Sequence, residues 1–142
     1  MILDYTFSTD TPYLTALFHE RDRTKTLPFL FGLCERYRTL TVEAPIANFE
    51  GDRFTALVEM ANVAVVFLTP DFLKDPTLCG ALHHLVRRDV PILLVHLTPA
   101  ELSPGMQLQL SLCPAFYPDR HPTLQSAVKT LQNAPFLREA MA

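Results

Sequence analysis

The sequence is poor in glycine, with only four in 142 residues, and it has no tryptophan. None of the patterns G-x-G-x-x-G, G-x-x-x-x-G-K-[ST] or G-x-S-x-G occurs, although phosphate-cradling loops and nucleophile turns depend on such glycines. These absences argue against hydrolases and nucleotide kinases. Twelve prolines indicate instead many firm turns and stable order almost throughout the chain.

The chain also lacks an excess of positive charge and any long hydrophobic run. Its formal net charge is -3 and its pI is about 5.9, which gives no basic surface for nucleic acid. The longest apolar runs, "VAVVFL" and "PILLV", are far shorter than the roughly 20 residues that span a bilayer. The opening "MILDYTF" has no basic n-region and no small-residue cleavage site, so we expect no secretory signal. We therefore expect a cytoplasmic protein with no membrane or nucleic-acid partner.

The cysteines offer no disulfide framework. Cys34, Cys79 and Cys113 are odd in number, widely spaced and set among apolar residues. We expect three buried thiols and no metal site. His83 and His84 do not change this expectation, because adjacent helical residues point about 100° apart and cannot chelate one ion together.

Alternating strand and helix patterns predict the fold. We expect one domain, residues 1–142, with a tail after about residue 134 that frays. Short apolar or alternating runs predict five strands: Ile2–Phe7, Thr39–Glu43, Val63–Leu68, Pro91–Leu97 and Ala115–Tyr117. Helical patterns cover Pro12–Glu20, Leu27–Tyr37, Phe54–Met60, Asp75–Arg88 and Pro122–Gln132. Such alternation is typical of a flavodoxin-like three-layer α/β sandwich with a five-stranded, mainly parallel sheet between helices.

The helix after the third predicted strand has a well-marked start. Asp75 followed by Pro76 is typical of an N-cap and a first helical residue. Counting from Pro76 puts four apolar residues on one stripe and His84, Arg87 and Arg88 mostly toward water. The stripe, which makes Leu82 a core position, consists of Leu78, Leu82, Leu85 and Val86.

Four stretches follow one another in an order that resembles the TIR (Toll/interleukin-1 receptor) domain family. They are "DYTFSTD" after the opening strand, "NFEGDRF" in the loop after the second, "VVFLTPDFL" at the third and "PILLVHLTPAELSPGMQLQLSLCP" at the fourth. The resemblance covers nearly the whole chain, although the segment from Arg21 to Leu40 is longer than the family usually needs. It implies either cleavage or rearrangement of NAD or protein assembly without catalysis.

The NAD chemistry of the family implies a glutamate early in the helix after the third strand, where a fixed anion stabilises charge developing on the ribose. Aligning Cys79 with the family's cysteine puts Leu82 at the glutamate position, or His83 if the spacing is one longer. No acidic residue occurs between Asp75 and Asp89. Catalysis would need a displaced carboxylate, with Asp71 and Glu50 as weak candidates against their roles as turn and loop residues.

The remaining candidates concern ligands and partners. Ser8, Asp71 and His83 are expected to line a ligand pocket, and His96 at a strand end is either structural or a ligand contact. The resemblance implies that residues 45–52 form a docking loop, which includes Ile46, Phe49, Glu50, Gly51 and Asp52. We expect an assembly module in immune, stress or antiphage signalling that binds itself or a related domain, without a cofactor. Two alternatives stay open: an NAD-consuming enzyme, and a domain that binds a nucleotide-derived signal without cleaving it.

Overall fold

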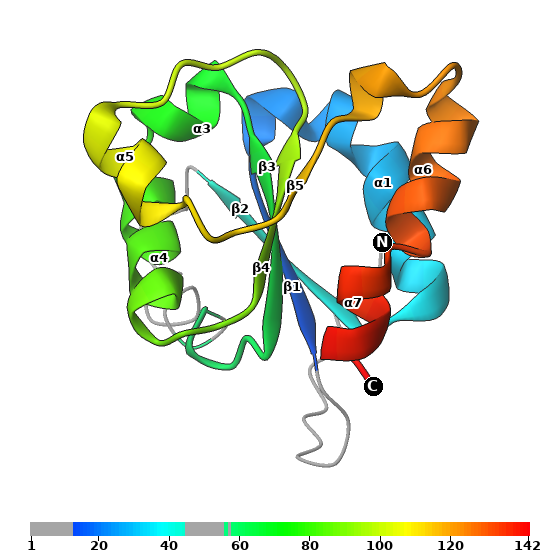
Figure 1. The fold of residues 1–142 in the computed structure, drawn as a ribbon, viewed down its shortest axis with the longest axis horizontal. Coiled ribbons are helices and arrows are strands. Elements are labelled where there is room, and N and C mark those ends of the chain that lie inside the picture. Colours follow the sequence, from blue (N-terminus) through cyan, green and yellow to red (C-terminus); the bar gives the residue numbers. More distant parts are fainter. Residues whose placement is uncertain (1–12, 45–55, 57) are drawn as a thin grey trace.

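A computed structural model describes residues 13–44, 56 and 58–142. Strands and helices alternate along these residues, and Figure 1 shows them in sequence colours. In chain order the elements are β1 (Leu14–His19), the 3-10 turn η1 (Glu20–Asp22), α1 (Arg23–Arg36), β2 (Thr39–Ala44), β3 (Val63–Leu68), α3 (Pro70–Lys74), α4 (Pro76–Arg87), β4 (Ile92–His96), α5 (Pro104–Gln109), β5 (Ala115–Phe116), the 3-10 turn η3 (Pro118–Arg120), α6 (Leu124–Gln132) and α7 (Pro135–Ala140).

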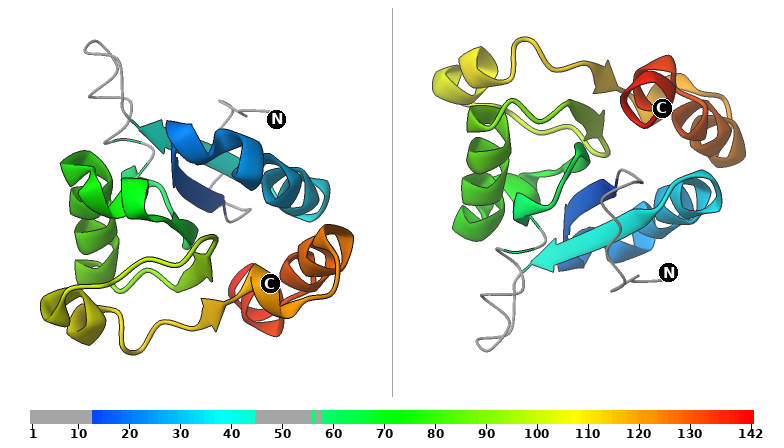
Figure 2. Two further views of the ribbon diagram at one scale, coloured as in Figure 1. Left: turned by 90° about the horizontal axis from the view of Figure 1, so that it is seen from above. Right: turned by 90° about the horizontal axis from the view of Figure 1, so that it is seen from below.

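The five strands form one parallel sheet in the order β2-β1-β3-β4-β5. The register sets Leu17 opposite Val66 and Ala64 opposite Ile92. Helices cover both faces of this sheet, so that three layers are visible from above and below (Figure 2). The predicted flavodoxin-like α/β fold is therefore confirmed, and the sheet is parallel throughout.

Two apolar clusters hold the layers together. One lies between the sheet and α3 and α4, and the other lies between the sheet and α1, α6 and α7. All six residues of β3 are buried, because successive side chains enter opposite clusters. This explains why "VAVVFL" is apolar at every position instead of alternating with polar residues.

Most of the predicted elements are found close to their expected bounds. The four predicted strands from Thr39 onward correspond to β2, β3, β4 and β5, and β3 has the predicted bounds. Helix α4 begins at Pro76 as predicted, and Ala56, Val58 and Glu59 are helical within the predicted helix 54–60. In the part of the chain that the structure describes, no helix is both long and apolar enough to cross a membrane.

The segment predicted as a helix over Pro12–Glu20 is instead β1, an interior strand between β2 and β3. Its residues Leu14 to Phe18 are all completely buried, since β2 and β3 flank the strand and helices cover both faces. A short, mainly apolar run has no periodicity that separates a buried strand from a buried helix. The predicted strand Ile2–Phe7 lies outside the described residues.

The carboxyl-terminal segment does not fray as predicted. Residues Pro135–Ala140 form α7, and Leu137 is completely buried in the cluster beneath α1 and α6. Phe136, Ala140 and Met141 also pack against this cluster, so the apolar side of a six-residue helix ties the end of the chain to the sheet. Helix α1 begins at Arg23 instead of Leu27, and the helices α3 and α5 were not predicted. Ser103 caps α5 by accepting a bond from the Met106 amide.

Helices α1 and α6 approach each other closely on one side of the sheet. A Cβ added to Gly32 of α1 would come within 2.6 Å of Val128 Cγ1 of α6, so the contact depends on this glycine. The Gln132 side chain donates to the Gly32 carbonyl at 2.7 Å, and Arg36 donates to Asn133 Oδ1 at 2.7 Å. Figure 1 shows the two helices side by side.

Candidate functional site

The strand order creates a switch point between β1 and β3. The chain moves outward to β2 after β1, and in the other direction to β4 after β3. In open parallel sheets, ligands bind in the crevice at the carboxyl ends of the two strands where the direction changes. A ligand site is therefore expected among the residues that directly follow His19 and Leu68.

Asp22 and Thr69 meet at this switch point. Asp22 follows β1 and is 7% exposed, while Thr69 follows β3 and is 1% exposed. The Thr69 hydroxyl donates to Asp22 Oδ2 at 2.5 Å and accepts from the Phe72 amide at 3.1 Å. Thr69 thus caps α3 and satisfies a buried carboxylate at the same time. This pair was not predicted from the sequence, because Asp22 was expected to follow a helix and not the interior strand β1.

His19 and Asp75 form a second contact at the same edge. His19 Nε2 lies 3.7 Å from Asp75 Oδ2, and both side chains are about nine-tenths buried, at 11% and 12% exposed. His19 Nδ1 accepts from the Arg21 amide, so in the neutral tautomer the proton is on the nitrogen that faces Asp75. The other oxygen of Asp75 accepts from the amides of Thr77 and Leu78. The predicted N-cap is confirmed, and this residue also links α4 to the end of β1.

Asp71, the strongest displaced-carboxylate candidate, lies in the first turn of α3. Its Oδ1 is 3.8 Å from Arg21 Nη1, with side chains 36% and 75% exposed. Such a solvent-exposed ion pair adds little stability. Asp71 therefore lies at the predicted edge of the sheet, next to a cation that would screen its charge from a ligand.

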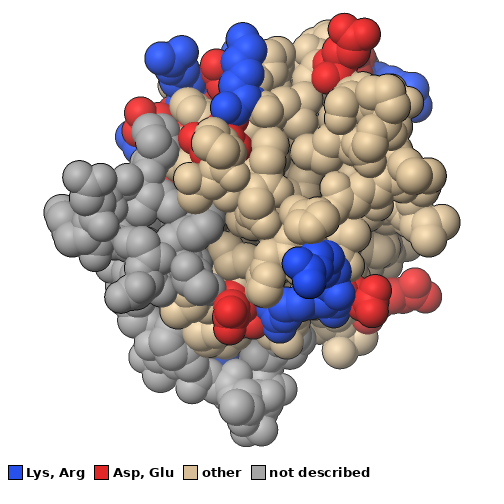
Figure 3. Space-filling model, turned by 90° about the vertical axis from the view of Figure 1, so that its left-hand side faces the viewer, with Lys and Arg blue, Asp and Glu red and all other residues tan. Residues whose placement is uncertain are grey.

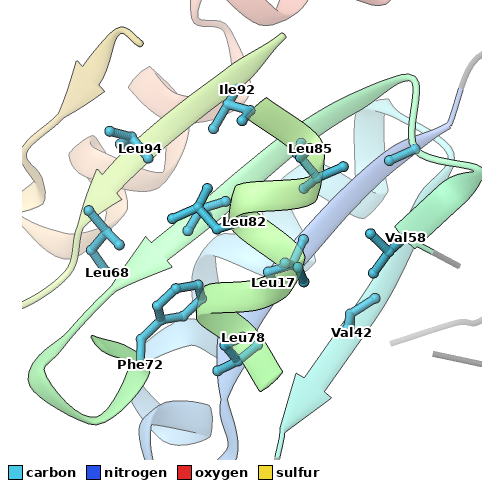
Figure 4. Packing of buried hydrophobic residues seen from close by; sticks show 14 of the residues in the cluster. Leu17, Val42, Val58, Leu68, Phe72, Leu78, Leu82, Leu85, Ile92 and Leu94 are labelled. Atoms are coloured by element: carbon cyan, nitrogen blue, oxygen red, sulfur yellow. The ribbon is translucent and has the colours of Figure 1, made fainter. Parts of the chain in front are cut away.

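His83 and Leu82 lie in different environments on α4. Leu82 is completely buried against the sheet, as predicted (Figure 4). His83 is exposed, and its Nδ1 lies 2.5 Å from Gln109 Nε2 of α5. The structure thus directs His83 toward α5. Ser8 of the expected pocket and Glu50, a candidate for the displaced carboxylate, lie outside the described residues. The same holds for the other residues of the expected docking loop, Ile46, Phe49, Gly51 and Asp52.

The cysteines are free and half-buried, which corrects the prediction of fully buried thiols. Burial raises the pKa of Cys113, and burial followed by the nearby charge of Asp75 raises the pKa of Cys79. The Cys79 sulfur also lies 3.4 Å from the Leu73 carbonyl oxygen. These thiols are therefore poor nucleophiles at neutral pH. Within residues 13–44, 56 and 58–142, no group of three or more His, Cys, Asp or Glu side chains is arranged to hold a metal ion.

His96 belongs to an aromatic stack at the end of β4. Its ring lies 4.6 Å from that of Tyr117 with an interplanar angle of 8°, and Arg120 lies 3.9 Å from the same tyrosine ring. Burial, followed by the positive charge of Arg120, lowers the pKa of His96, while Asp119 acts in the opposite direction. His96 is therefore neutral at pH 7, and its contacts are those of a structural residue.

We expect His96 to make the domain less stable in mild acid. The folded protein binds fewer protons here than the unfolded chain, whose histidine titrates near its ordinary value of about 6.5. The stability that this residue contributes is thus fully present above that pH and is lost as the pH falls toward the lowered pKa of the folded state. Urea unfolding from about pH 7.5 to pH 5 should show a decline that is smaller in His96→Gln. Equal declines in both proteins would assign the acid sensitivity to other groups.

Comparison with known proteins adds no assignment to this geometry. No protein-family model matches the chain, and no curated protein matches it at a significant level.

Proposed function

We propose that this domain is a TIR-like interaction and assembly module in immune or stress signalling, which binds another copy of itself or a related domain. The main support for this proposal is that the described polar side chains at the switch point contact one another. Asp22 is bound to Thr69 and His19 faces Asp75, so these groups join β1, α3 and α4. A site that served a substrate would instead direct such groups toward the crevice.

Helix α4 supports the same proposal. At the position where the TIR resemblance would require a catalytic glutamate, Leu82 is packed against the sheet, and the alternative position holds the exposed His83. The stretch "VVFLTPDFL" also supports the resemblance, because it forms β3, the Thr69 cap and α3 in the order that the family's motif implies. The first motif, "DYTFSTD", lies before the strand that is now β1, which weakens that part of the resemblance.

An NAD-consuming enzyme is the second candidate, and one observation favours it. Three carboxylates, Asp22, Asp71 and Asp75, lie just beyond the carboxyl ends of β1 and β3, where a ribose could bind. Each of them has a protein partner: Thr69, Arg21 and the first amides of α4, respectively. Catalysis would require one of these carboxylates to leave its partner first. We therefore favour the assembly function over the enzyme. A domain that binds an NAD-derived nucleotide without cleaving it is the third candidate.

Incubation with NAD should release no nicotinamide above the uncatalysed rate, even at protein concentrations that promote assembly. The reason is that no carboxylate occurs on the first turns of α4, so no fixed anion stabilises charge on the ribose from that helix. Chromatographic measurement of nicotinamide tests this. Turnover that Asp71→Asn abolishes, with Asp119→Asn as a control elsewhere on the surface, would instead establish the enzyme. A rise in melting temperature with NAD but without product would establish the nucleotide-binding domain.

A further inference from the structure

A small hollow lies at the edge of the sheet opposite the switch point. The end of α4, the start of β4, the turn after α5 and one residue of α7 surround a volume of about 270 Å³. Most of its lining is apolar: Val86, Val90, Pro91, Ile92, Leu112 and Phe136. Pockets that hold drug-sized ligands have volumes of about 300–1,000 Å³. This hollow is smaller and open to solvent, and it has room for an inserted side chain.

One of the lining residues also projects away from the protein. Leu112 follows α5 and is 96% exposed, and Leu108 on α5 is 78% exposed. Single exposed leucines are common and need no explanation. Here, however, an exposed apolar side chain stands at the rim of an apolar hollow. A surface with an apolar projection next to an apolar depression can be complementary to the same surface on a second copy of the chain.

Self-complementarity is the requirement for a two-fold contact between identical chains, in which each copy offers the same patch to the other. Charges of both signs also lie at or near the hollow. Asp89 lines it, and the exposed Arg87 precedes Asp89 by two residues; among the described residues neither forms an ion pair. Two-fold rotation can set Arg87 of each copy opposite Asp89 of the other. Figure 3 shows that the neighbouring face over α4 and α5 is largely uncharged, with charges gathered at its margins.

We infer that a second copy of this chain docks at the hollow. Leu112 of each copy enters the hollow of the other about a two-fold axis, and Arg87 of each copy pairs with Asp89 of the other. This inference rests on the proposed assembly function and deepens it, since it names the partner and the surface. The hollow has room for one side chain from each copy, so we expect a weak dimer that forms at high protein concentration.

Sedimentation velocity across a wide range of concentration tests the inference. The wild-type chain should shift from monomer to dimer as concentration rises. Leu112→Asp should weaken association tenfold or more, because it places a charge in an apolar contact, and it should leave the melting temperature unchanged. Leu124→Asp is the matched control: Leu124 is 56% exposed at the start of α6, away from the hollow, and this variant should associate like the wild type.

A charge exchange tests the two-fold geometry independently. Arg87→Asp and Asp89→Lys should each associate poorly alone, because like charges then face each other across the axis. An equimolar mixture should recover association, since both cross-axis pairs again join opposite charges. Asp89 has a φ of 58°, where lysine is strained, so the melting temperature of that variant is measured first. A mixture that associates no better than either variant would contradict the paired arrangement.

The outcomes separate this inference from the proposed function. If the wild type dimerises and Leu112→Asp dimerises equally well, assembly stands and the hollow is not the contact. If the wild type remains monomeric at every concentration, the inference of a second copy is overturned. The proposed function is then judged by the nicotinamide assay alone, because nicotinamide release would replace it whatever the oligomeric state.

Discussion

Replacement of Leu82 by alanine is expected to lower the free energy of unfolding by about 2–5 kcal/mol. Leu82 is completely buried, and Figure 4 shows it projecting from α4 toward the sheet, between Leu68, Leu94 and Leu17. The change removes apolar burial and leaves a cavity that the surrounding strands can fill only in part. Urea unfolding of both proteins at pH 7 measures the difference.

Leu112→Ala provides the matched control for this measurement. It is the same chemical change at a residue that is 96% exposed, and so it should alter the free energy of unfolding by less than about 0.5 kcal/mol. If Leu82→Ala were equally mild, its side chain would face solvent or a pocket. The position where the TIR resemblance expects a glutamate would then be open to ligand, and the catalytic alternative would regain support.

Thr69→Ala is expected to lower the free energy of unfolding by about 2–4 kcal/mol, because one hydroxyl has two structural roles. Loss of the cap of α3 costs about 1 kcal/mol. The buried Asp22 carboxylate also loses the hydroxyl that donates to it, and a charged group without its hydrogen-bond partner in the interior adds about 1–3 kcal/mol. Chemical unfolding at neutral pH measures the sum.

Two further substitutions at this position separate the roles of the hydroxyl. Thr69→Ser keeps the donor and the cap and should recover most of the stability. Thr69→Val keeps the shape but removes both bonds and should resemble Thr69→Ala. If Thr69→Val were as stable as the wild type, Asp22 would not depend on this hydroxyl. The carboxylate would then be available to a ligand at the switch point, which contradicts the main support for assembly.

The helix α4 shows what local sequence can determine. Asp75 caps the next residues of the chain, and successive members of the apolar stripe are at most four residues apart. Capping and periodicity therefore predict where the helix begins and which side is buried, and the structure confirms both. The same holds for β3, where a continuous apolar run between polar boundaries predicts the bounds of the strand.

Strand β1 shows where local reasoning fails. Its apolar residues are compatible with a helix or a strand, and only the neighbours β2 and β3 decide between them by supplying hydrogen-bond partners on both sides. The error also affected the site. With a helix placed over residues 12–20, nothing in the sequence indicated that His19 ends an interior strand and that Asp22 follows it, so neither residue was a site candidate.

The sequence by itself determined the fold class, the start of α4, the burial of Leu82 and the lack of a carboxylate on the first turns of that helix. Each of these follows from side-chain type and from spacing within one element. Only the tertiary structure decided that residues 14–19 form an interior strand, which carboxylates meet at the switch point and that Leu112 lies beside a hollow. Asp22 and Thr69 are 47 residues apart, and Val86 and Phe136 lie on different helices. Such residues come together because crossover connections bring distant segments of the chain to one sheet. No local sequence pattern predicts these contacts.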